Sequence, residues 1–210
     1  MYHALPVNMP VRGRGYKKSS KLELPYPLLV VEEGLELHLL RSKDALEIFS
    51  VIDSNRDYLK NWLPWIDDIK TPLDENNFIQ STLKEYENGK GVNYSIKLNN
   101  QIIGNIGLNW MDYNNRSCGV GYWLSEEFTN NGIMTKCCIG LMKHCFDDLE
   151  FHRLVLEVAV NNLPSIAIAN RLGMRLEGVT KDREWLYDHF VDANLYALIA
   201  DEISIHEIKP

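Results

Sequence analysis

Long apolar runs are missing from this 210-residue chain. A membrane-spanning helix needs about 20 consecutive apolar residues, and no stretch of the sequence approaches that length. The N-terminal segment also lacks the apolar core of a signal peptide. We therefore expect no membrane association and a cytoplasmic protein.

Cysteine and histidine are sparse, and neither follows a metal-binding pattern. The six histidines show no H-E-x-x-H or comparable spacing, so we predict no metal site. The four cysteines form no C-x-x-C pair, and three of them fall on one expected helix. Buried free thiols in a reducing compartment are the simplest interpretation of Cys118, Cys137, Cys138 and Cys145.

Basic residues are outnumbered by acidic ones. The 22 Lys and Arg residues face 29 Asp and Glu residues, and the formal net charge is −7. This balance argues against a general nucleic-acid-binding surface and slightly favours a cationic substrate or partner. It does not exclude an anionic ligand, because the free amides at a helix N-terminus bind anions locally whatever the net charge.

Residues 1–27 differ in composition from the rest of the chain. The run "RGRGYKKSSK" is basic and has no apolar periodicity, and "LPYP" closes the segment. We expect a flexible basic leader, followed by a single domain over 28–210. The leader could contact RNA, although a short charge run is more often a solvated tail.

Beyond the leader, apolar residues alternate between helical and strand-like spacing. The first half should hold a strand, two helices and a three-strand antiparallel meander that turns at Asn99-Asn100. The expected bounds are 35–40, 43–60, 73–88, 92–98, 101–110 and 117–124. The second half should alternate helix and strand and end on two strands, over 132–149, 152–160, 164–172, 175–180 and 191–200. This order indicates an α/β or α+β sandwich with a mixed sheet.

The turn "TNNGIMT" (129–135) lies between a strand and a helix. Asn and Gly tolerate a positive φ and Asn caps helices, so an ordinary turn between a strand and a helix explains these residues. Alternatively, such a turn directs several free backbone N–H groups at one point, where a phosphate can bind. Taken alone, the heptapeptide favours an ordinary turn over a phosphate-binding one, because short motifs often match by accident.

The whole pattern resembles the GCN5-related N-acetyltransferase (GNAT) superfamily, and within it the RimJ/RimL-like branch, known for acetylating N-terminal amines of ribosomal proteins. The resemblance extends over about 35–201, and four segments carry it: "NWLPWIDD", "GYWLSEEFTNNGIMT", "RLVLEVAVNNLPSIAIANRLGM" and "VDANLYAL". It implies an α/β (α+β) GNAT fold. That fold has a mixed, mostly antiparallel sheet of about seven strands, helices on both faces, and a splayed fourth and fifth strand.

The resemblance also implies that the turn binds the pyrophosphate of acetyl-coenzyme A (acetyl-CoA) through backbone amides. Gly132 matches the family pattern, whereas Thr129 replaces the usual Gln or Arg and Asn130 replaces a common Gly. Main-chain contacts tolerate these departures, since Asn is the best non-glycine residue for positive φ. We therefore favour the phosphate site, made by Thr129, Asn130, Asn131, Gly132, Ile133, Met134 and Thr135.

The fourth and fifth strands of the resemblance would be 118–124 and 154–160. Their splayed backbones would pair with the pantetheine arm as an added strand does. An amide of Trp123 or Leu124 would then face the thioester carbonyl. The side chains of Tyr122 and Trp123 could at the same time belong to the core.

The catalytic residues are inferred from the same resemblance. The tyrosine that many GNAT enzymes use as acid is replaced by Ala169. The RimL pattern N-x-x-S instead points to Ser165, with Asn162 at its start; Ser165 would hydrogen-bond to the departing sulfur or merely cap a helix. The expected base is Glu184. Its competitors are a water relay and the side chains of Glu157, Asp182, Asp188 and His189.

The acceptor side is expected at "NWLPW", where Trp62 and Trp65 would line the substrate site or pack in the core. Asp67 and Asp68 could attract a cation but more often form a solvated turn. We expect the acceptor to be a protein N-terminal α-amine. A small amine such as a polyamine or an aminoglycoside, a non-catalytic acetyl-CoA sensor, and an RNA- or ribosome-binding module using the leader stay as alternatives. RimL relatives often pair, so a homodimer is also open.

Overall fold

The computed structural model describes residues 27–202, so the basic leader of 1–26 lies outside the described part. Its centre is an eight-stranded sheet in the order β1-β2-β3-β4-β5-β6-β8-β7. Every neighbouring pair is antiparallel except β5 and β6, which run parallel. The expected mixed, mostly antiparallel sheet is confirmed. The strands are β1 (Leu28–Glu32), β2 (Leu35–Leu39), β3 (Val92–Leu98), β4 (Gln101–Asp112), β5 (Ser117–Leu124), β6 (Arg153–Ala159), β7 (Arg175–Leu186) and β8 (His189–Ile199).

The additional strand relative to the expected seven is β1. It is an edge strand that pairs only with β2. Leu29 and Val31 are half-buried against the core, whereas Leu28 and Val30 are exposed. Because all four residues are apolar, the sequence shows no alternation between apolar and polar residues that would reveal the strand. The fourth and fifth strands of the sequence interpretation are therefore labelled β5 and β6.

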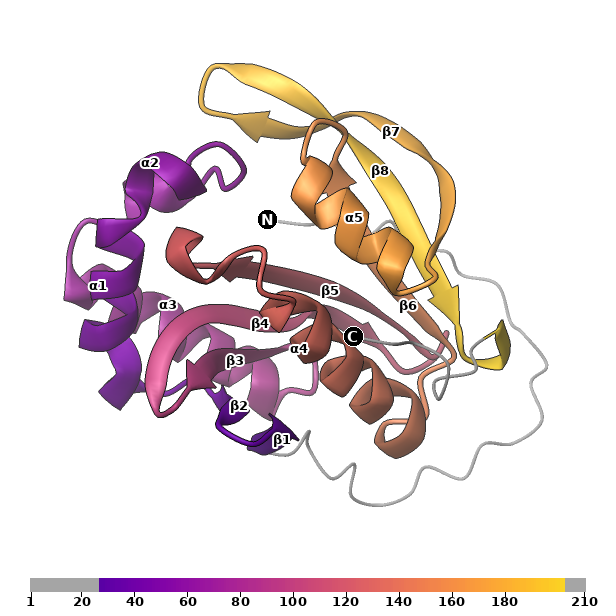
Figure 1. Ribbon diagram of the computed structural model, residues 1–210, viewed down its shortest axis with the longest axis horizontal. Coiled ribbons are helices and arrows are strands. Elements are labelled where there is room, and N and C mark those ends of the chain that lie inside the picture. Colours follow the sequence, from indigo (N-terminus) through magenta and orange to yellow (C-terminus); the bar gives the residue numbers. More distant parts are fainter. Residues whose placement is uncertain (1–26, 203–210) are drawn as a thin grey trace.

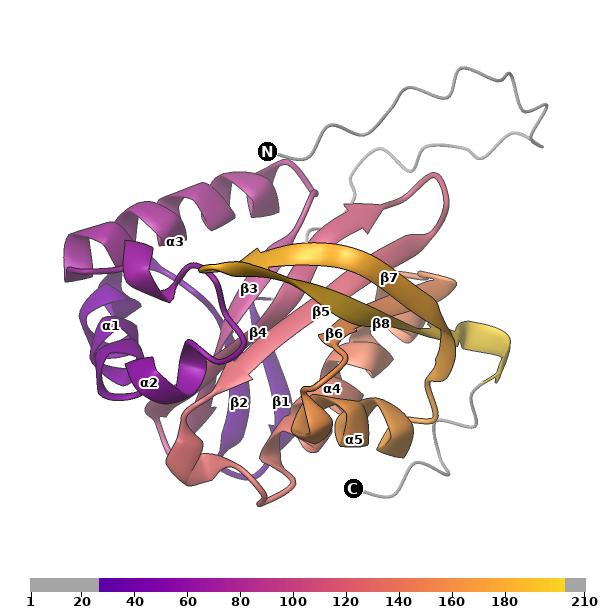
Figure 2. The same cartoon turned by 90° about the horizontal axis from the view of Figure 1, so that it is seen from above.

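Helices cover both faces of the sheet (Figures 1 and 2). Neighbouring residues of β4 show this directly, because successive side chains of a strand point to opposite faces. Ile102 packs in a cluster with Ile48 of α1 and Ile79 of α3, whereas Ile103 packs with Cys137 and Leu141 of α4. The helices are α1 (Ala45–Ser54), α2 (Arg56–Leu59), α3 (Pro72–Glu87), α4 (Ile133–Lys143) and α5 (Leu163–Arg171), with short turns η1 (Ser42–Asp44), η2 (Ile66–Asp68), η3 (Glu126–Phe128), the π-helical η4 (His144–Asp148) and η5 (Ala200–Glu202).

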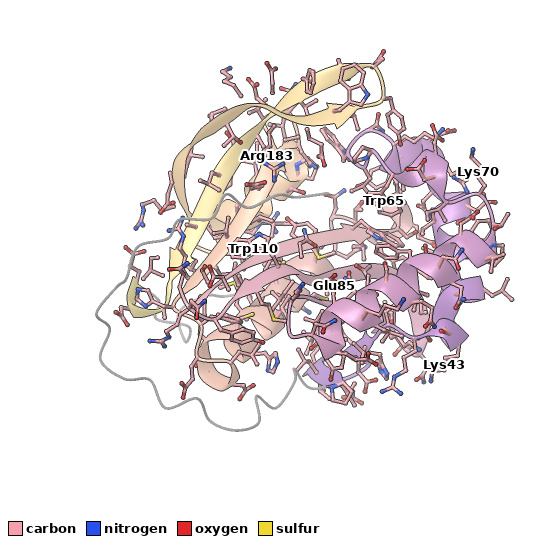
Figure 3. The ribbon with its side chains drawn as sticks, turned by 180° about the vertical axis from the view of Figure 1, so that it is seen from behind. Lys43, Trp65, Lys70, Glu85, Trp110 and Arg183 are labelled. Atoms are coloured by element: carbon pink, nitrogen blue, oxygen red, sulfur yellow. The ribbon has the colours of Figure 1, made fainter. Side chains whose placement is uncertain are left out.

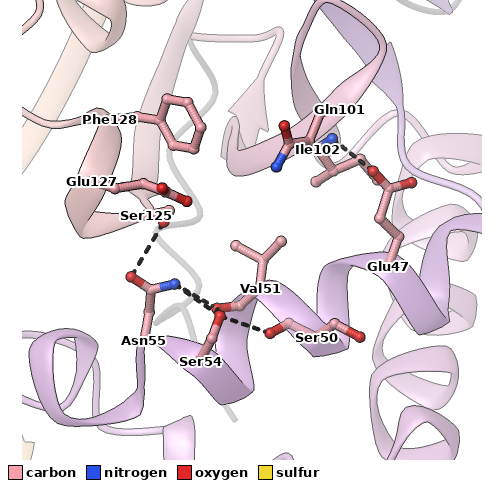
Figure 4. A pocket seen from close by; sticks show the side chains of 10 residues that line it. All are labelled: Glu47, Ser50, Val51, Ser54, Asn55, Gln101, Ile102, Ser125, Glu127 and Phe128. Atoms are coloured by element: carbon pink, nitrogen blue, oxygen red, sulfur yellow. Dashed lines mark hydrogen bonds between the residues drawn. The ribbon is translucent and has the colours of Figure 1, made fainter.

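The helix expected over 43–60 is wrong as a single element. It breaks at Asn55, whose φ of −118° and ψ of 13° are not helical. The Asn55 Oδ1 atom accepts a hydrogen bond from the Ser125 Oγ at 3.2 Å (Figure 4). It also accepts one from the Glu126 N–H at 2.9 Å. This tertiary contact ties the break to the end of β5, which local periodicity cannot reveal.

The segment between the closing strands also differs from the expectation. The predicted strands end at 180 and begin again at 191, whereas β7 continues to Leu186 and β8 begins at His189, so that Glu184 pairs with Val191 inside a long hairpin. Most side chains of β7 are exposed, so neither face imposes an apolar period on the sequence. The hairpin reaches across the molecule toward α2 (Figures 1 and 2).

The four cysteines are buried and unpaired, as expected. Among residues 27–202, no helix is long and apolar enough to cross a membrane.

Candidate active site

The parallel strands β5 and β6 separate halfway along their length. They pair from Ser117–Arg153 to Val120–Leu156 and no further. Beyond that point β5 stays paired with β4 up to Leu124, and β6 stays paired with β8 up to Ala159. The splay expected between 118–124 and 154–160 is thus confirmed, and it leaves backbone polar groups of both strands facing the gap.

Strand alternation shows which amide of β5 faces this gap. The Ser125 N–H donates to the Ile103 carbonyl oxygen at 2.8 Å, toward β4. Because alternate amides of a strand point to opposite sides, the Leu124 N–H points toward the gap and that of Trp123 toward β4. Of the two expected donors, the geometry favours Leu124. The Trp123 side chain is 9% exposed and packs in the core against the helices of the N-terminal half.

A cavity of about 1520 Å³ surrounds the gap. Typical small-molecule pockets measure roughly 300–1,000 Å³, so this one has room for a long ligand and a second molecule. Its walls come from the N-terminal helices, β5 and β6, the turn before α4, the start of α5, and the β7–β8 hairpin. Of the site residues expected from the sequence, only Asn131 does not line the cavity; its side chain is exposed. The expected residues that do line it are Trp62, Trp65, Trp123, Leu124, Thr129, Asn130, Gly132, Ile133, Met134, Thr135, Asn162, Ser165 and Glu184.

A second cavity of about 300 Å³ lies between α1 and the end of β5 (Figure 4). Two of its polar side chains are already engaged within the protein: Glu47 accepts the Ile102 N–H at 2.7 Å, and Asn55 accepts from Ser125 at 3.2 Å. We therefore regard it as part of the framework.

The turn before α4 leaves helix amides free. Asn130 and Gly132 adopt φ angles of +61° and +74°, so the expected tolerance for positive φ is used at both positions. A Cβ at Gly132 would meet no atom within 4 Å, so this glycine is required by conformation rather than by crowding. The helices α3 and α5 are capped by Thr71 and Asn162, but no side chain caps α4. Its first amides face the cavity and suit an anion.

Arg171 adds a positive charge beside this turn. Its Nη1 donates to the Thr135 Oγ1 at 2.5 Å, and both residues line the cavity. Sequence reasoning missed Arg171, because it lies at the end of α5 and only the packing of α5 near α4 brings it to the turn. The only signal was a basic residue within the "ANRLGM" segment.

Ser165 lies on the cavity wall in the first turn of α5. The interpretation of Ser165 as a cap is wrong, because Asn162 Oδ1 accepts the Ser165 N–H at 3.2 Å and is itself the cap. Burial raises the pKa of Tyr122, and the nearby Ser165 side chain opposes this rise. Ala169, which stands where the resemblance would place a tyrosine, is fully buried and offers no hydroxyl group. The phenol close to Ser165 is that of Tyr122 instead. The sequence interpretation had assigned the Tyr122 side chain only to the core.

Glu184 and Glu157 face the cavity from neighbouring parts of the sheet. Burial raises the pKa of Glu184, the positive charge of Arg183 lowers it, and the negative charge of Glu157 raises it. Arg183 forms a salt bridge with Glu157. The other expected bases do not line the cavity: Asp182 donates its N–H to Asp192 at 3.0 Å, and Asp188 pairs with His189 at 2.7 Å in the hairpin turn.

Aromatic side chains form the opposite wall. Trp65 stacks on Phe78 with ring centroids 6.5 Å apart and an interplanar angle of 10°. Figure 3 shows Trp65 on the helical side and Arg183 on the hairpin side. Asp67 pairs with Lys60 at 2.5 Å, and neither Asp67 nor Asp68 borders the cavity. The solvated-turn interpretation therefore holds for these two aspartates.

Comparisons with known proteins agree with this geometry. A family model described as an acetyltransferase (GNAT) domain matches residues 35–175. The ribosomal-protein-serine acetyltransferase of Escherichia coli is 30% identical over 81% of this chain and 96% of its own length. The YdaF protein of Bacillus subtilis, a ribosomal N-acetyltransferase by name, is 28% identical over 82% and 94%.

Solved structures extend the comparison. RimL, the ribosomal L7/L12 α-N-protein acetyltransferase, in complex with coenzyme A is 27% identical, covers 82% of this chain and 97% of that chain, and superposes with a TM-score of 0.80. The microcin C7 self-immunity acetyltransferase MccE in complex with acetyl-CoA and AMP is 28% identical over 80% and 94%, with a TM-score of 0.78. The resemblance inferred from the sequence motifs is thereby confirmed.

Proposed function

This chain belongs to the acetyltransferase (GNAT) family and is an acetyl-CoA-dependent N-acetyltransferase, and we propose that its acceptor is the N-terminal α-amine of a protein. One observation carries the proposal. The uncapped turn, the splayed strands and the Trp62–Trp65 wall all open into one cavity. Two relatives that are 28–30% identical over 81–82% of this chain are named as acetyltransferases of ribosomal proteins.

The residues present fit acetyl-CoA. The free amides at Gly132 and Ile133, together with Arg171, would hold the pyrophosphate. The unpaired backbone edges of β5 and β6 would pair with the pantetheine arm. When bound there, the cosubstrate supplies an activated acetyl thioester.

The remaining roles belong to side chains and amides of this chain. The Leu124 N–H would donate to the thioester carbonyl oxygen, where negative charge develops during attack. Ser165 would donate a hydrogen bond to the sulfur. Glu184, directly or through water, would accept the proton of the attacking amine, because an α-ammonium group with a pKa near 7.7–8.0 is largely protonated at neutral pH. Trp62 and Trp65 would contact the acceptor.

A smaller acceptor is the second candidate. Trp65 and Phe78 present a flat, nearly parallel aromatic pair at the edge of the cavity, and the MccE structure contains AMP. A nucleotide-linked amine or another small aromatic amine could stack there.

Mass spectrometry of acetyl transfer separates the candidates. The panel holds peptides with Ser, Thr or Ala N-termini, spermidine, an aminoglycoside and an aminoacyl adenylate analogue. Acetylation of a peptide α-amine supports the proposal, and acetylation of small amines alone overturns it in favour of the second candidate. No product, with a melting temperature that still rises on acetyl-CoA addition, would favour a sensor.

A further inference from the structure

Glu75 is a carboxyl group in an unusual place. It lies in the first turn of α3, on the same helical face as Ile79 and Thr82, and this face points inward. Its side chain is only 2% exposed, while Ile79 one turn later is fully buried in the core cluster of the N-terminal helices. An inward position that would ordinarily hold an apolar residue therefore holds a charge-bearing one.

Among the described residues, no side chain or backbone group forms a hydrogen bond or a salt bridge with this carboxyl group. Asp44, the other buried acidic residue among 27–202, accepts the Arg41 N–H at 3.0 Å and has the Lys97 Nζ at 3.5 Å. Glu75 has no hydrogen bond or salt bridge within the same range, and burial raises its pKa to about 7. The cations that line the same cavity, Lys90, Arg171 and Arg183, form no salt bridge with it.

The cavity explains why an unpaired carboxyl group is buried at this position. Glu75 lines it together with aromatic residues, namely Tyr58, Trp62, Trp65 and Phe78. Buried charges in proteins are normally paired, so an unpaired carboxyl group beside a cavity indicates that the partner is a ligand. A carboxylate in a cavity that is also lined by aromatic rings suits a positively charged amine, because ring faces also attract cations.

We propose that Glu75 is the specificity residue of the acceptor side and binds the positively charged amine of the acceptor as it enters the cavity. The inference rests on the proposed transferase function but not on the acceptor being a peptide. It makes the enzyme selective for cationic acceptors. It also assigns different tasks to two acidic residues: Glu75 recognises the ammonium group, and Glu184 serves the later proton transfer.

The test compares Glu75→Gln, which removes the charge at constant shape, with Glu75→Asp, which keeps it. Glu87→Gln is the matched control, since Glu87 is on the same helix, is exposed and does not line the cavity. Michaelis constants are measured for acetyl-CoA and for each acceptor that the wild type uses. Calorimetry with coenzyme A present measures binding of two unreactive peptides, one with a trimethylated N-terminus that is permanently cationic and one with a neutral acetylated N-terminus.

We expect Glu75→Gln to raise the KM of the acceptor about tenfold or more and to weaken the cationic peptide by a similar factor, because both lose the Coulombic attraction of the carboxylate; the trimethylated peptide has no N–H group to donate. Binding of the neutral peptide and the KM of acetyl-CoA should stay as in the wild type. Glu75→Asp should recover part of the loss, and Glu87→Gln should behave like the wild type.

Equal effects of Glu75→Gln on the cationic and the neutral peptide, or no effect on either, would overturn the inference and make Glu75 a structural residue. If the wild type acetylates only spermidine, the peptide acceptor fails and Glu75 is judged on the KM of spermidine. If no amine of the panel is acetylated, it is judged on the trimethylated peptide, and equal binding by wild type and Glu75→Gln refutes it.

Discussion

The Tyr187 hydroxyl donates a 2.7 Å hydrogen bond to the carbonyl oxygen of Leu63. The contact joins the turn of the β7–β8 hairpin to the "NWLPW" segment, and the Lys60 Nζ lies 6.0 Å from the centre of the Tyr187 ring. Leu63 and the hairpin residue Glu184 both line the cavity. The bond therefore connects two walls that are far apart in the sequence.

Removing this bond with Tyr187→Phe should loosen the hairpin against the helices. We expect kcat/KM for the acceptor to fall several-fold while the KM of acetyl-CoA stays constant, and the free energy of unfolding to fall by about 1 kcal/mol. Hydrogen exchange over 60–66 and 184–190 should become faster. Unchanged exchange in both segments would show that the bond does not hold the walls together.

Gly132 offers a test of the phosphate site. Gly132→Asp adds a negative charge at the turn, and Gly173→Asp makes the same change at φ +70°, with no atom within 4 Å of a Cβ and away from the cavity. Both variants should lose stability, about 1–3 kcal/mol, for a non-glycine residue at positive φ, and Gly173→Asp should lose more, because it places the negative charge at the C-terminus of α5 and Gly132→Asp places it at the N-terminus of α4. Only Gly132→Asp should raise the KM of acetyl-CoA, by about tenfold. A similar rise in Gly173→Asp would assign the effect to stability.

Ser165 and its cap can be separated by mutation. Ser165→Ala should lower kcat by about tenfold, the value of one lost hydrogen bond, with little change in the melting temperature. Asn162→Ala removes the cap and should instead cost about 1 kcal/mol of stability. A folded Ser165→Ala variant with no activity at all would contradict a hydrogen-bonding role, and Tyr122→Phe would show whether the neighbouring phenol contributes.

Glu184→Gln tests the base. The pKa of Glu184 is raised, chiefly by burial, so the acidic limb of the pH profile of kcat/KM should lie above the ordinary value of 4.5. The variant should lose about 100-fold in kcat together with that limb. Asp188→Asn, which changes an exposed residue outside the cavity, should leave the profile unchanged. If the limb persists in Glu184→Gln, a water relay or Glu157 takes the proton.

Glu75 should also affect stability as a function of pH. Its pKa is about 7 in the folded chain against an ordinary 4.5, so the folded state binds the proton more tightly than the unfolded state. The stabilising effect is complete below pH 4.5 and is lost as the pH rises through 7. The difference corresponds to roughly 3 kcal/mol, and the melting temperature of the wild type should therefore fall relative to Glu75→Gln across this range. Parallel curves would show that the carboxyl group is not buried in solution.

Local patterns in the sequence were sufficient for most elements of the fold. The strands β3, β4 and β5 follow from alternation on one face and from a turn at Asn99-Asn100, where both residues adopt positive φ. The helix α3 follows from Thr71, Pro72 and Asp74, which form a capping box with a proline in the first turn. In each case, the residues that determine the conformation are neighbours along the chain.

The site was predictable only as far as its residues belong to a motif. The turn at Gly132 and the serine after Asn162 could be found because backbone conformation and helix capping are local properties. Tyr122, Arg171 and Glu75 could not, because their roles depend on which elements pack beside them. Arg171 reaches the turn before α4 only because α5 packs near α4, and Tyr122 meets Ser165 only across the splayed strands.

The sequence by itself thus determined the order of elements, the positive-φ turn before α4 and the membership of a family, all of which depend on residues close together in the chain. Only the tertiary structure decided where α1 ends, how far the last hairpin extends and which acidic side chains face the cavity. Asn55 breaks its helix by bonding to Ser125, and Glu75 is buried because α3 packs on α1. Such contacts join residues many positions apart, and their free energies exist only once the chain has folded.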